Sequence, residues 1–119
     1  MKVAGVLLED PETFPTSGVL TSPNFPLNYP NDLHQRRTIE VPKGSVVNIH
    51  FTDFEVESWS RTGPDYVELI NGDGTLLRRI HSIEHARGNI TSVTETLHVL
   101  FHTDHNLAKR GWSLEWWSM

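Results

Sequence analysis

The chain has 119 residues, which is enough for one domain with a single core and too few for two. Its formal net charge of −5, with histidine counted as neutral, argues against nucleic acid as a partner, because phosphate binding needs a basic surface. No apolar run approaches the ~20 residues that a membrane-spanning helix requires. The chain contains no cysteine, which taken alone favours a reducing compartment, since small secreted domains usually carry disulfides.

Prolines dominate the first part of the chain. Five of them fall within residues 9–31, and proline fixes φ and removes a backbone donor, so this stretch is neither a helix nor a central strand. A short strand is predicted within it at residues 18–21. We expect an N-terminal extension at residues 1–15 and a single domain at residues 16–119.

The rest of the chain alternates between apolar and polar residues, as half-buried strands do. The clearest alternation places Val47, Ile49 and Phe51 on one face of a strand. Turn signals separate the runs, of which Asn-Gly-Asp-Gly at residues 71–74 is the strongest. No window shows a helical stripe, so an antiparallel sandwich or barrel is expected. The predicted strands after the first lie at residues 37–41, 45–54, 66–70, 96–104 and 111–117.

Three segments, in this order, resemble a known family. The first resembles the opening motif of CUB domains and reads GVLTSPNFP at residues 18–26, with Tyr29-Pro30 after it. The second and third resemble later CUB motifs and read DYVEL at residues 65–69 and LFHTD at residues 100–104, with Gly111-Trp112 beyond. The resemblance implies an all-β fold, namely an antiparallel two-sheet β-sandwich with jelly-roll-like topology.

The resemblance also implies a calcium site. In a subset of CUB domains, the residues that match Glu57, Asp65 and Asp104 hold one calcium ion at one end of the sandwich. Calcium takes six to eight oxygen ligands, and a divalent cation relieves the repulsion between carboxylates that are held together. By the same resemblance, an oxygen of Asn106 or Leu107 completes the shell. Leu107 stands where many members have asparagine, so one side-chain ligand is missing.

Two further residues bear on this site. Tyr29 matches a tyrosine that supports the ligating glutamate, here Glu57, through a hydrogen bond. Asp73 lies in the Asn-Gly-Asp-Gly segment, which is more typical of a hairpin turn than of a calcium loop.

Seven histidines raise the question of zinc. His98 and His102 share a strand face, but positions four apart along a strand are separated by about 13 Å, too far to share one ion. His50 and His98 are candidates for cross-strand neighbours. No cysteine and no HExxH motif supports them, so zinc is not expected. His105 lies next to the proposed calcium loop and is predicted to contact a partner.

Tryptophans suggest where a partner binds. Trp59 lies between Glu57 and Asp65, where it either packs over the sandwich edge or presents an interaction surface. Trp116 and Trp117 are adjacent on a predicted strand and should therefore face opposite ways. The alternative function is a metal-independent β-sandwich module that binds carbohydrate or protein through an exposed Trp59 and Trp117.

The favoured function is a calcium-binding, extracellular protein-interaction module within a larger secreted or cell-surface protein. The sequence contains no GxSxG motif, no reactive cysteine and no phosphate-binding glycine loop. The module is therefore expected not to be an enzyme, even if its parent protein is a protease. In the family, a basic side chain of the partner protein commonly meets the acidic metal site, and homodimers are known.

The missing cysteines depart from the family, in which most members have two disulfides. Each disulfide typically contributes ~2–4 kcal/mol, so bound calcium is expected to take a larger share in stabilising the fold. A naturally divergent member and a chain whose cysteines were engineered out both fit the sequence. Asn89-Ile90-Thr91 is a glycosylation sequon that suits a secreted parent. The usual cysteine positions are held by Thr16, His34 or Gln35, Thr62 or Gly63, and Arg78.

Overall fold

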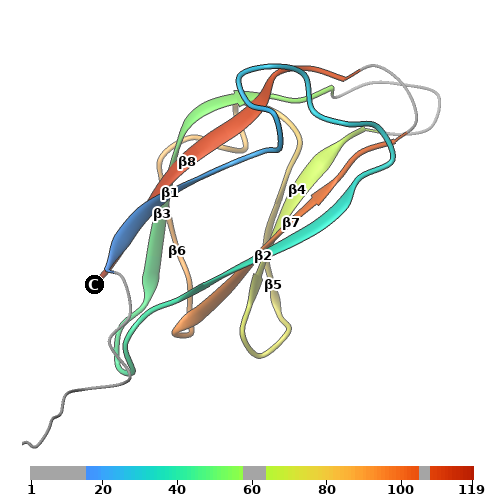
Figure 1. The fold of residues 1–119 in the computed structure, drawn as a ribbon. Coiled ribbons are helices and arrows are strands. Elements are labelled where there is room, and N and C mark those ends of the chain that lie inside the picture. Colours follow the sequence, from blue (N-terminus) through green and yellow to red (C-terminus); the bar gives the residue numbers. More distant parts are fainter. Residues whose placement is uncertain (1–15, 58–63, 105–107) are drawn as a thin grey trace, which may run out of the picture.

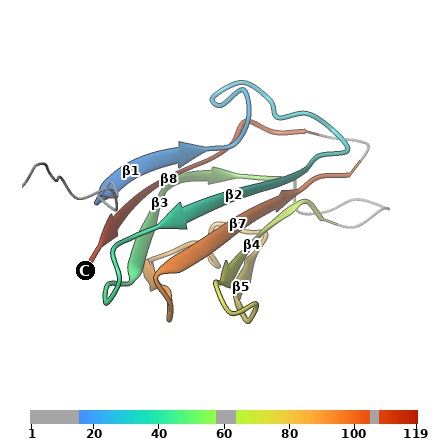
Figure 2. The same ribbon diagram turned by 60° about the horizontal axis from the view of Figure 1, so that its bottom comes forward.

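The computed structural model describes residues 16–57, 64–104 and 108–119, and it consists of two antiparallel four-stranded sheets (Figure 1). The first sheet has the strand order β1-β8-β3-β6, formed by Ser17–Thr21, Gly111–Ser118, Val47–Glu55 and Asn89–Thr91. The second sheet has the order β2-β7-β4-β5, formed by His34–Glu40, Thr96–His102, Tyr66–Asn71 and Leu76–Ile80. Figure 2 shows the two sheets as separate layers. The predicted two-sheet sandwich is confirmed.

The core lies between the sheets and follows the alternation in the sequence. Along β7, every second side chain is buried, and the same holds for the first half of β3 on its inward face. Trp112 of β8 is fully buried at the centre, with its ring edge-on to Phe51 of β3 and Phe101 of β7, at centroid distances of 6.0 and 5.8 Å. Aromatic rings from both sheets therefore fill the middle of the sandwich.

Two strands were not predicted, and both lie at sheet edges. β5 shows no clean alternation, because an edge strand at the surface exposes residues on both of its faces. β6 has only three residues, which is too short for a periodic signal. The described residues contain no helix long and apolar enough to cross a membrane.

The expectation that His50 and His98 are cross-strand neighbours was wrong. His50 lies on β3 of the first sheet, whereas His98 lies on β7 of the second. Alternation gives the face of a side chain but not the sheet to which its strand belongs. The prediction for the tryptophan pair is confirmed, because Trp116 is buried in the core and Trp117 is half-buried on the opposite face of β8.

At Gly111, the start of β8 packs closely against Ser22, the residue that follows β1. The φ of Gly111 is +95°, and a Cβ atom there would lie 1.9 Å from the Oγ atom of Ser22. That hydroxyl accepts a hydrogen bond of 3.0 Å from the N–H of Trp112. Just before Gly111, the carbonyl of Lys109 accepts a hydrogen bond of 3.0 Å from the N–H of Tyr29. This close approach therefore fixes the path of the chain that leads to Tyr29.

Replacing this glycine tests the close approach. Gly111→Ala should destabilise the fold through both the positive φ, about 1–2 kcal/mol, and the clash with Ser22, about 1–3 kcal/mol more. Gly74 is a matched control, because its φ is +92° but a Cβ atom added there would meet no other atom within 4 Å. Urea denaturation should show a clearly larger loss for Gly111→Ala than for Gly74→Ala. Equal losses would mean that the contact with Ser22 does not constrain the fold.

Candidate metal centre

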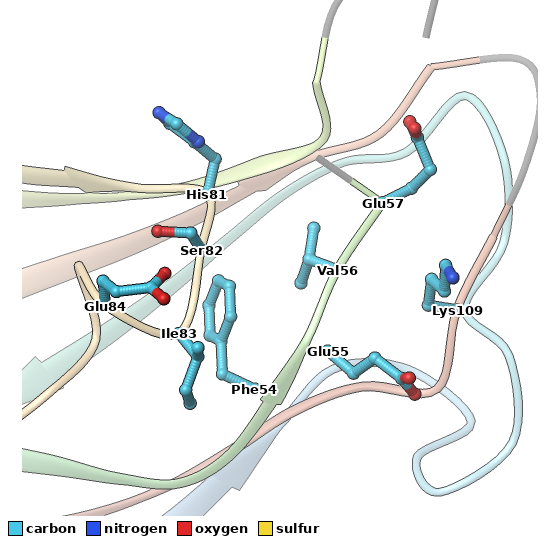
Figure 3. Close-up of a pocket in the computed structure, with 9 residues that line it drawn as sticks. All are labelled: Phe54, Glu55, Val56, Glu57, His81, Ser82, Ile83, Glu84 and Lys109. Atoms are coloured by element: carbon cyan, nitrogen blue, oxygen red, sulfur yellow. The ribbon is translucent and has the colours of Figure 1, made fainter. Parts of the chain in front are cut away.

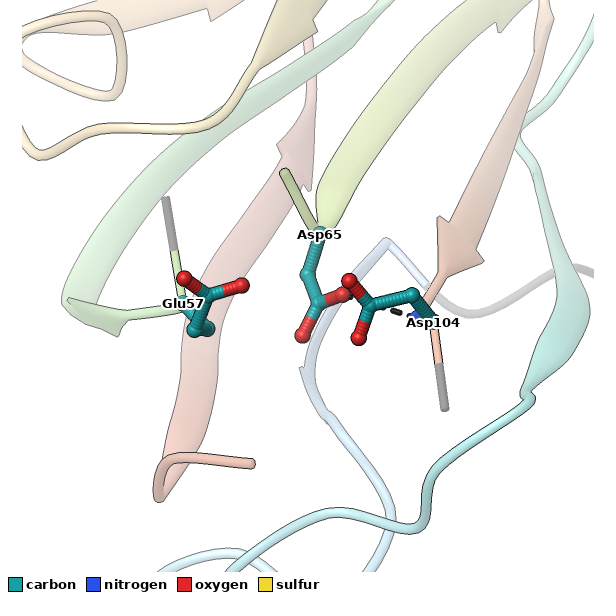
Figure 4. A group of neighbouring side chains, drawn as sticks. All are labelled: Glu57, Asp65 and Asp104. Atoms are coloured by element: carbon teal, nitrogen blue, oxygen red, sulfur yellow. Dashed lines mark hydrogen bonds between the residues drawn. The ribbon is translucent and has the colours of Figure 1, made fainter. Parts of the chain in front are cut away.

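Three acidic side chains converge at one end of the sandwich (Figure 4). Glu57 follows β3 of the first sheet, Asp65 precedes β4 of the second, and Asp104 follows β7 of the second. One carboxylate oxygen from each residue lies within 4.8 Å of those of the other two. All three residues are buried, with exposed fractions of 4%, 0% and 8%. The structure thus brings together three residues that are 8 to 47 positions apart in the sequence, by differences of their numbers.

Asp65 holds this acidic cluster together through its hydrogen bonds. Its Oδ1 atom accepts a bond of 2.8 Å from the backbone N–H of Asp104, drawn in Figure 4. Its Oδ2 atom accepts a bond of 2.6 Å from the hydroxyl of Tyr29. Its own N–H donates to the carbonyl of Glu57 at 2.9 Å. The carboxylate of Asp65 is therefore oriented from two sides before any ligand binds.

Tyr29 links the two halves of the acidic cluster. The tyrosine is 2% exposed, and its ring packs edge-on against Phe101 at 5.0 Å. The hydroxyl donates its proton to Asp65 and accepts a hydrogen bond of 2.9 Å from the backbone N–H of Glu57. Its contact with Glu57 is thus made to the main chain and not to the carboxylate. Burial, followed by the bond to Asp65, raises the pKa of Tyr29, so the hydroxyl stays protonated and remains a donor.

The electrostatics of the acidic cluster favour a cation. Burial is the main reason why the pKa of Asp65 is raised, and the nearby charge of Asp104 raises it further. The hydrogen bonds from Tyr29 and Asp104 act in the opposite direction and keep the ionised form accessible. Oxygens that share one calcium ion lie ~2.3–2.6 Å from it, so they are at most roughly 5 Å apart. One carboxylate oxygen from each of the three residues lies within 4.8 Å of the other two, so these oxygens satisfy that condition.

Thr103 contributes to the site, although sequence reasoning missed it. Its hydroxyl donates to the carbonyl of Pro30 at 2.9 Å and accepts from the N–H of Leu33 at 2.7 Å. The next residue, Asp104, accepts from the N–H of Asp32 at 2.7 Å through its carbonyl. These bonds hold the segment after β7 against the segment before β2. A buried threonine at a strand end gives no periodic signal that would mark this role.

An open cleft of about 430 Å³ lies beside the acidic cluster and shares Glu57 with it (Figure 3). Three carboxylates and one lysine ammonium group line it, together with one histidine. Glu55 is paired with Arg110 at 2.8 Å, and the cleft lies where a partner near the cluster would reach it. Its lining consists of Phe54, Glu55, Val56, Glu57, His81, Ser82, Ile83, Glu84 and Lys109.

Asp73 lies outside the acidic cluster, as predicted, and some residues of the predicted site are outside the described part of the chain. Asp73 is in a hairpin turn, as expected, where its Oδ1 atom accepts hydrogen bonds from the backbone and hydroxyl of Thr75 at 3.0 and 2.7 Å. Four other residues of the predicted site lie outside the described residues, and their roles stay predictions. They are Trp59, His105, Asn106 and Leu107.

Related proteins share this architecture. Cubilin of Rattus norvegicus is 36% identical over 104 residues, which is 87% of this chain and 3% of cubilin. The structure of the full extracellular region of zebrafish Gpr126/Adgrg6 has 26% identity and a TM-score of 0.78, over 88% of this chain and 14% of that one. The crystal structure of the MASP-1 CUB2 domain bound to Ca²⁺ has 23% identity and a TM-score of 0.70. It covers 87% of this chain and 93% of that domain, and at this identity the likeness concerns the fold.

The family model of the CUB domain matches residues 10–116. The match begins within the predicted N-terminal extension, and the boundary at residue 16 stays a prediction. The chain spans only a small part of cubilin, so cubilin as a whole says little about this chain. The length of the match to the family model and the 36% identity to a cubilin segment show that this chain belongs to the CUB domain family.

Proposed function

We propose that this domain is a calcium-binding module of an extracellular protein, in which Glu57, Asp65 and Asp104 hold one calcium ion. The carrying observation is the convergence of three buried carboxylates, with oxygens within 4.8 Å, from strand ends in both sheets. Carboxylate oxygens are the ligands that calcium prefers. The Ca²⁺-bound CUB2 domain of MASP-1 supports the proposal as a fold neighbour. CUB domains are non-catalytic, so this chain is not an enzyme.

The residues around the acidic cluster prepare it for a cation. The ion supplies positive charge that offsets the repulsion between the carboxylates. Tyr29 and the N–H of Asp104 keep both oxygens of Asp65 in place, which lowers the cost of ordering the site on binding. Asn106 and Leu107 are proposed to add oxygens, as the family resemblance implies.

The partner is proposed to be a protein that presents a basic side chain to this end of the sandwich. The cleft next to Glu57 supports this, because Glu84 adds a second carboxylate to its lining, whereas Glu55 is already paired with Arg110 at 2.8 Å. His105 and Trp59 are proposed to contact the same partner, and a homodimer stays a second arrangement. The structural similarity to the extracellular region of zebrafish Gpr126/Adgrg6 supports an extracellular or secreted location. The metal-independent alternative, binding through Trp59 and Trp117, predicts partner binding that survives a chelator.

Calcium should bind to the folded protein and stabilise it. At a hundredfold excess of calcium over its Kd, the gain is ~2.7 kcal/mol. For a domain of this size, that gain raises Tm by on the order of 10 °C. Calorimetric titration should show one ion per chain, and a chelator should reverse the rise in Tm.

Two variants locate the ion. Asp104→Asn should abolish both the heat of binding and the calcium-dependent rise in Tm, because it removes a charged ligand. Asp73→Asn is the matched control, since Asp73 is fully exposed in a turn and should leave both unchanged. Identical melting curves of the unaltered protein with and without calcium would overturn the proposal.

Tyr29→Phe tests the preparation of the site. The change removes the donor to Asp65 and the acceptor for Glu57 while keeping the ring, so we expect a loss of about 1–3 kcal/mol in unfolding free energy. Calcium affinity should also fall, because the Asp65 carboxylate is no longer oriented. Tyr66→Phe is the control, because no hydrogen bond of its hydroxyl is found among the described residues. A Tyr29→Phe variant with unchanged stability and calcium affinity would show that the hydroxyl is dispensable.

A further inference from the structure

A row of three aromatic rings lies across the outer face of the second sheet. His34 of β2, His102 of β7 and Tyr66 of β4 occupy directly opposite positions in adjacent strands. The Nδ1 atoms of His34 and His102 are 3.0 Å apart, and one ring donates a hydrogen bond to the other across this distance. Tyr66 stacks on the other side of His102, with ring centroids 4.8 Å apart and planes 24° apart. Sequence reasoning compared His102 only with His98 and missed His34, because the pairing depends on the register of β2 against β7.

Two neighbouring side chains, Arg79 and Glu68, help to hold these rings in position. The guanidinium group of Arg79 lies over the Tyr66 ring at 4.3 Å and pairs with the carboxylate of Glu68 at 2.6 Å. Stacking and the cation–π contact restrict Tyr66, which in turn restricts His102. A cavity of about 170 Å³ opens beside the two histidines, and Arg36, Tyr66 and Glu68 are among its lining residues. That volume accommodates an ion and a few waters at ~30 Å³ each.

We propose that His34 and His102 form a binding site for a divalent transition-metal ion of the Ni²⁺, Cu²⁺ and Zn²⁺ group. Imidazole nitrogen is a preferred ligand of these ions. Two nitrogens at ~2.0–2.1 Å from one ion lie roughly 3.0 Å apart at a right angle and roughly 3.3 Å apart in a tetrahedron. The observed 3.0 Å matches adjacent positions of a square-planar or octahedral shell. Binding the ion replaces the hydrogen bond between the two rings: the proton shared by the Nδ1 atoms leaves, and both rings turn about their broad χ2 torsions to present a lone pair.

The site is open on one side. Among the described residues, no third imidazole or carboxylate joins the pair at ligand distance, since the one group of three is the acidic cluster. Glu68 lines the same cavity, but it is held by two bonds from Arg79, at 2.9 and 2.6 Å. Waters, or a side chain of a second molecule, therefore complete the shell.

This site differs from the acidic cluster in the class of ion it takes, although His102 lies close enough to Asp65 for its charge to lower the pKa of that carboxyl. Calcium is a hard cation that takes oxygen ligands, whereas two neutral imidazoles select borderline ions that calcium does not replace. Binding at the histidines should therefore persist when the acidic cluster is saturated with calcium. The inference does not depend on the calcium proposal, because each site has its own ion and its own variant.

The test is a calorimetric titration of the tag-free protein with Ni²⁺ in excess calcium, together with Cu²⁺ electron paramagnetic resonance. We expect one Ni²⁺ per chain and a spectrum with two imidazole nitrogens. His34→Ala should weaken Ni²⁺ binding at least tenfold and leave one nitrogen in the spectrum. His34 is exposed, so this variant should fold, which near-ultraviolet circular dichroism checks. His102→Ala should repeat the loss.

Two histidine variants serve as controls. His98→Ala removes a histidine from the same sheet face whose Nδ1 lies 3.0 Å from the hydroxyl of Thr38. His85→Ala breaks the other close pair, in which the rings of His81 and His85 lie 4.5 Å apart at 88°. Both variants should bind Ni²⁺ within twofold of the unaltered protein. Equal affinity of His34→Ala and the unaltered protein, or an equal loss in either control, would overturn the proposal.

Discussion

The hydrogen bond from the Tyr29 hydroxyl to Asp65 connects three parts of the chain that no strand pairing joins. Tyr29 lies between β1 and β2, Asp65 enters β4, and the same hydroxyl receives the N–H of Glu57 after β3. A fully buried carboxylate is costly unless it is hydrogen-bonded, and Asp65 meets this requirement through Tyr29 and the N–H of Asp104. These bonds orient the carboxylate of Asp65 and hold the main chain at Glu57 and Asp104 in place. A cation gains most under this condition, since the site needs little rearrangement to receive it.

The central strands were predicted well from the sequence, because the two faces of each strand differ from one another in burial. β4 and β7 alternate in burial along their whole length, and the inward residues predicted for β3 are found in the core. The edge strands β5 and β6 showed no usable pattern, since exposure on both faces or a length of three residues removes the alternation. Local pattern also could not assign β3 and β7 to different sheets, which is why His50 and His98 were wrongly placed together.

The acidic cluster shows a different limit. Glu57, Asp65 and Asp104 were identified from the family resemblance, because loop carboxylates carry no local signal that separates a ligand from a solvated group. Their convergence depends on the turns between strands, and the bond from Tyr29 to Asp65 depends on a segment without regular structure. The pairing of His34 with His102 likewise needs the register of β2 against β7. Contacts of this kind follow from topology and become visible only in three dimensions.

The absence of cysteine gives the polar end of the sandwich a larger part in holding the domain together. Without disulfides, no covalent link limits the unfolded ensemble, so the folded state depends on the core, on hydrogen bonds and on any ligand that binds only the folded chain. The ligands of the proposed calcium site come from both sheets, and the unfolded chain cannot present them together. Calcium would therefore couple the two sheets at the end where Tyr29 already links them, and the stability of this domain would follow the calcium concentration around it.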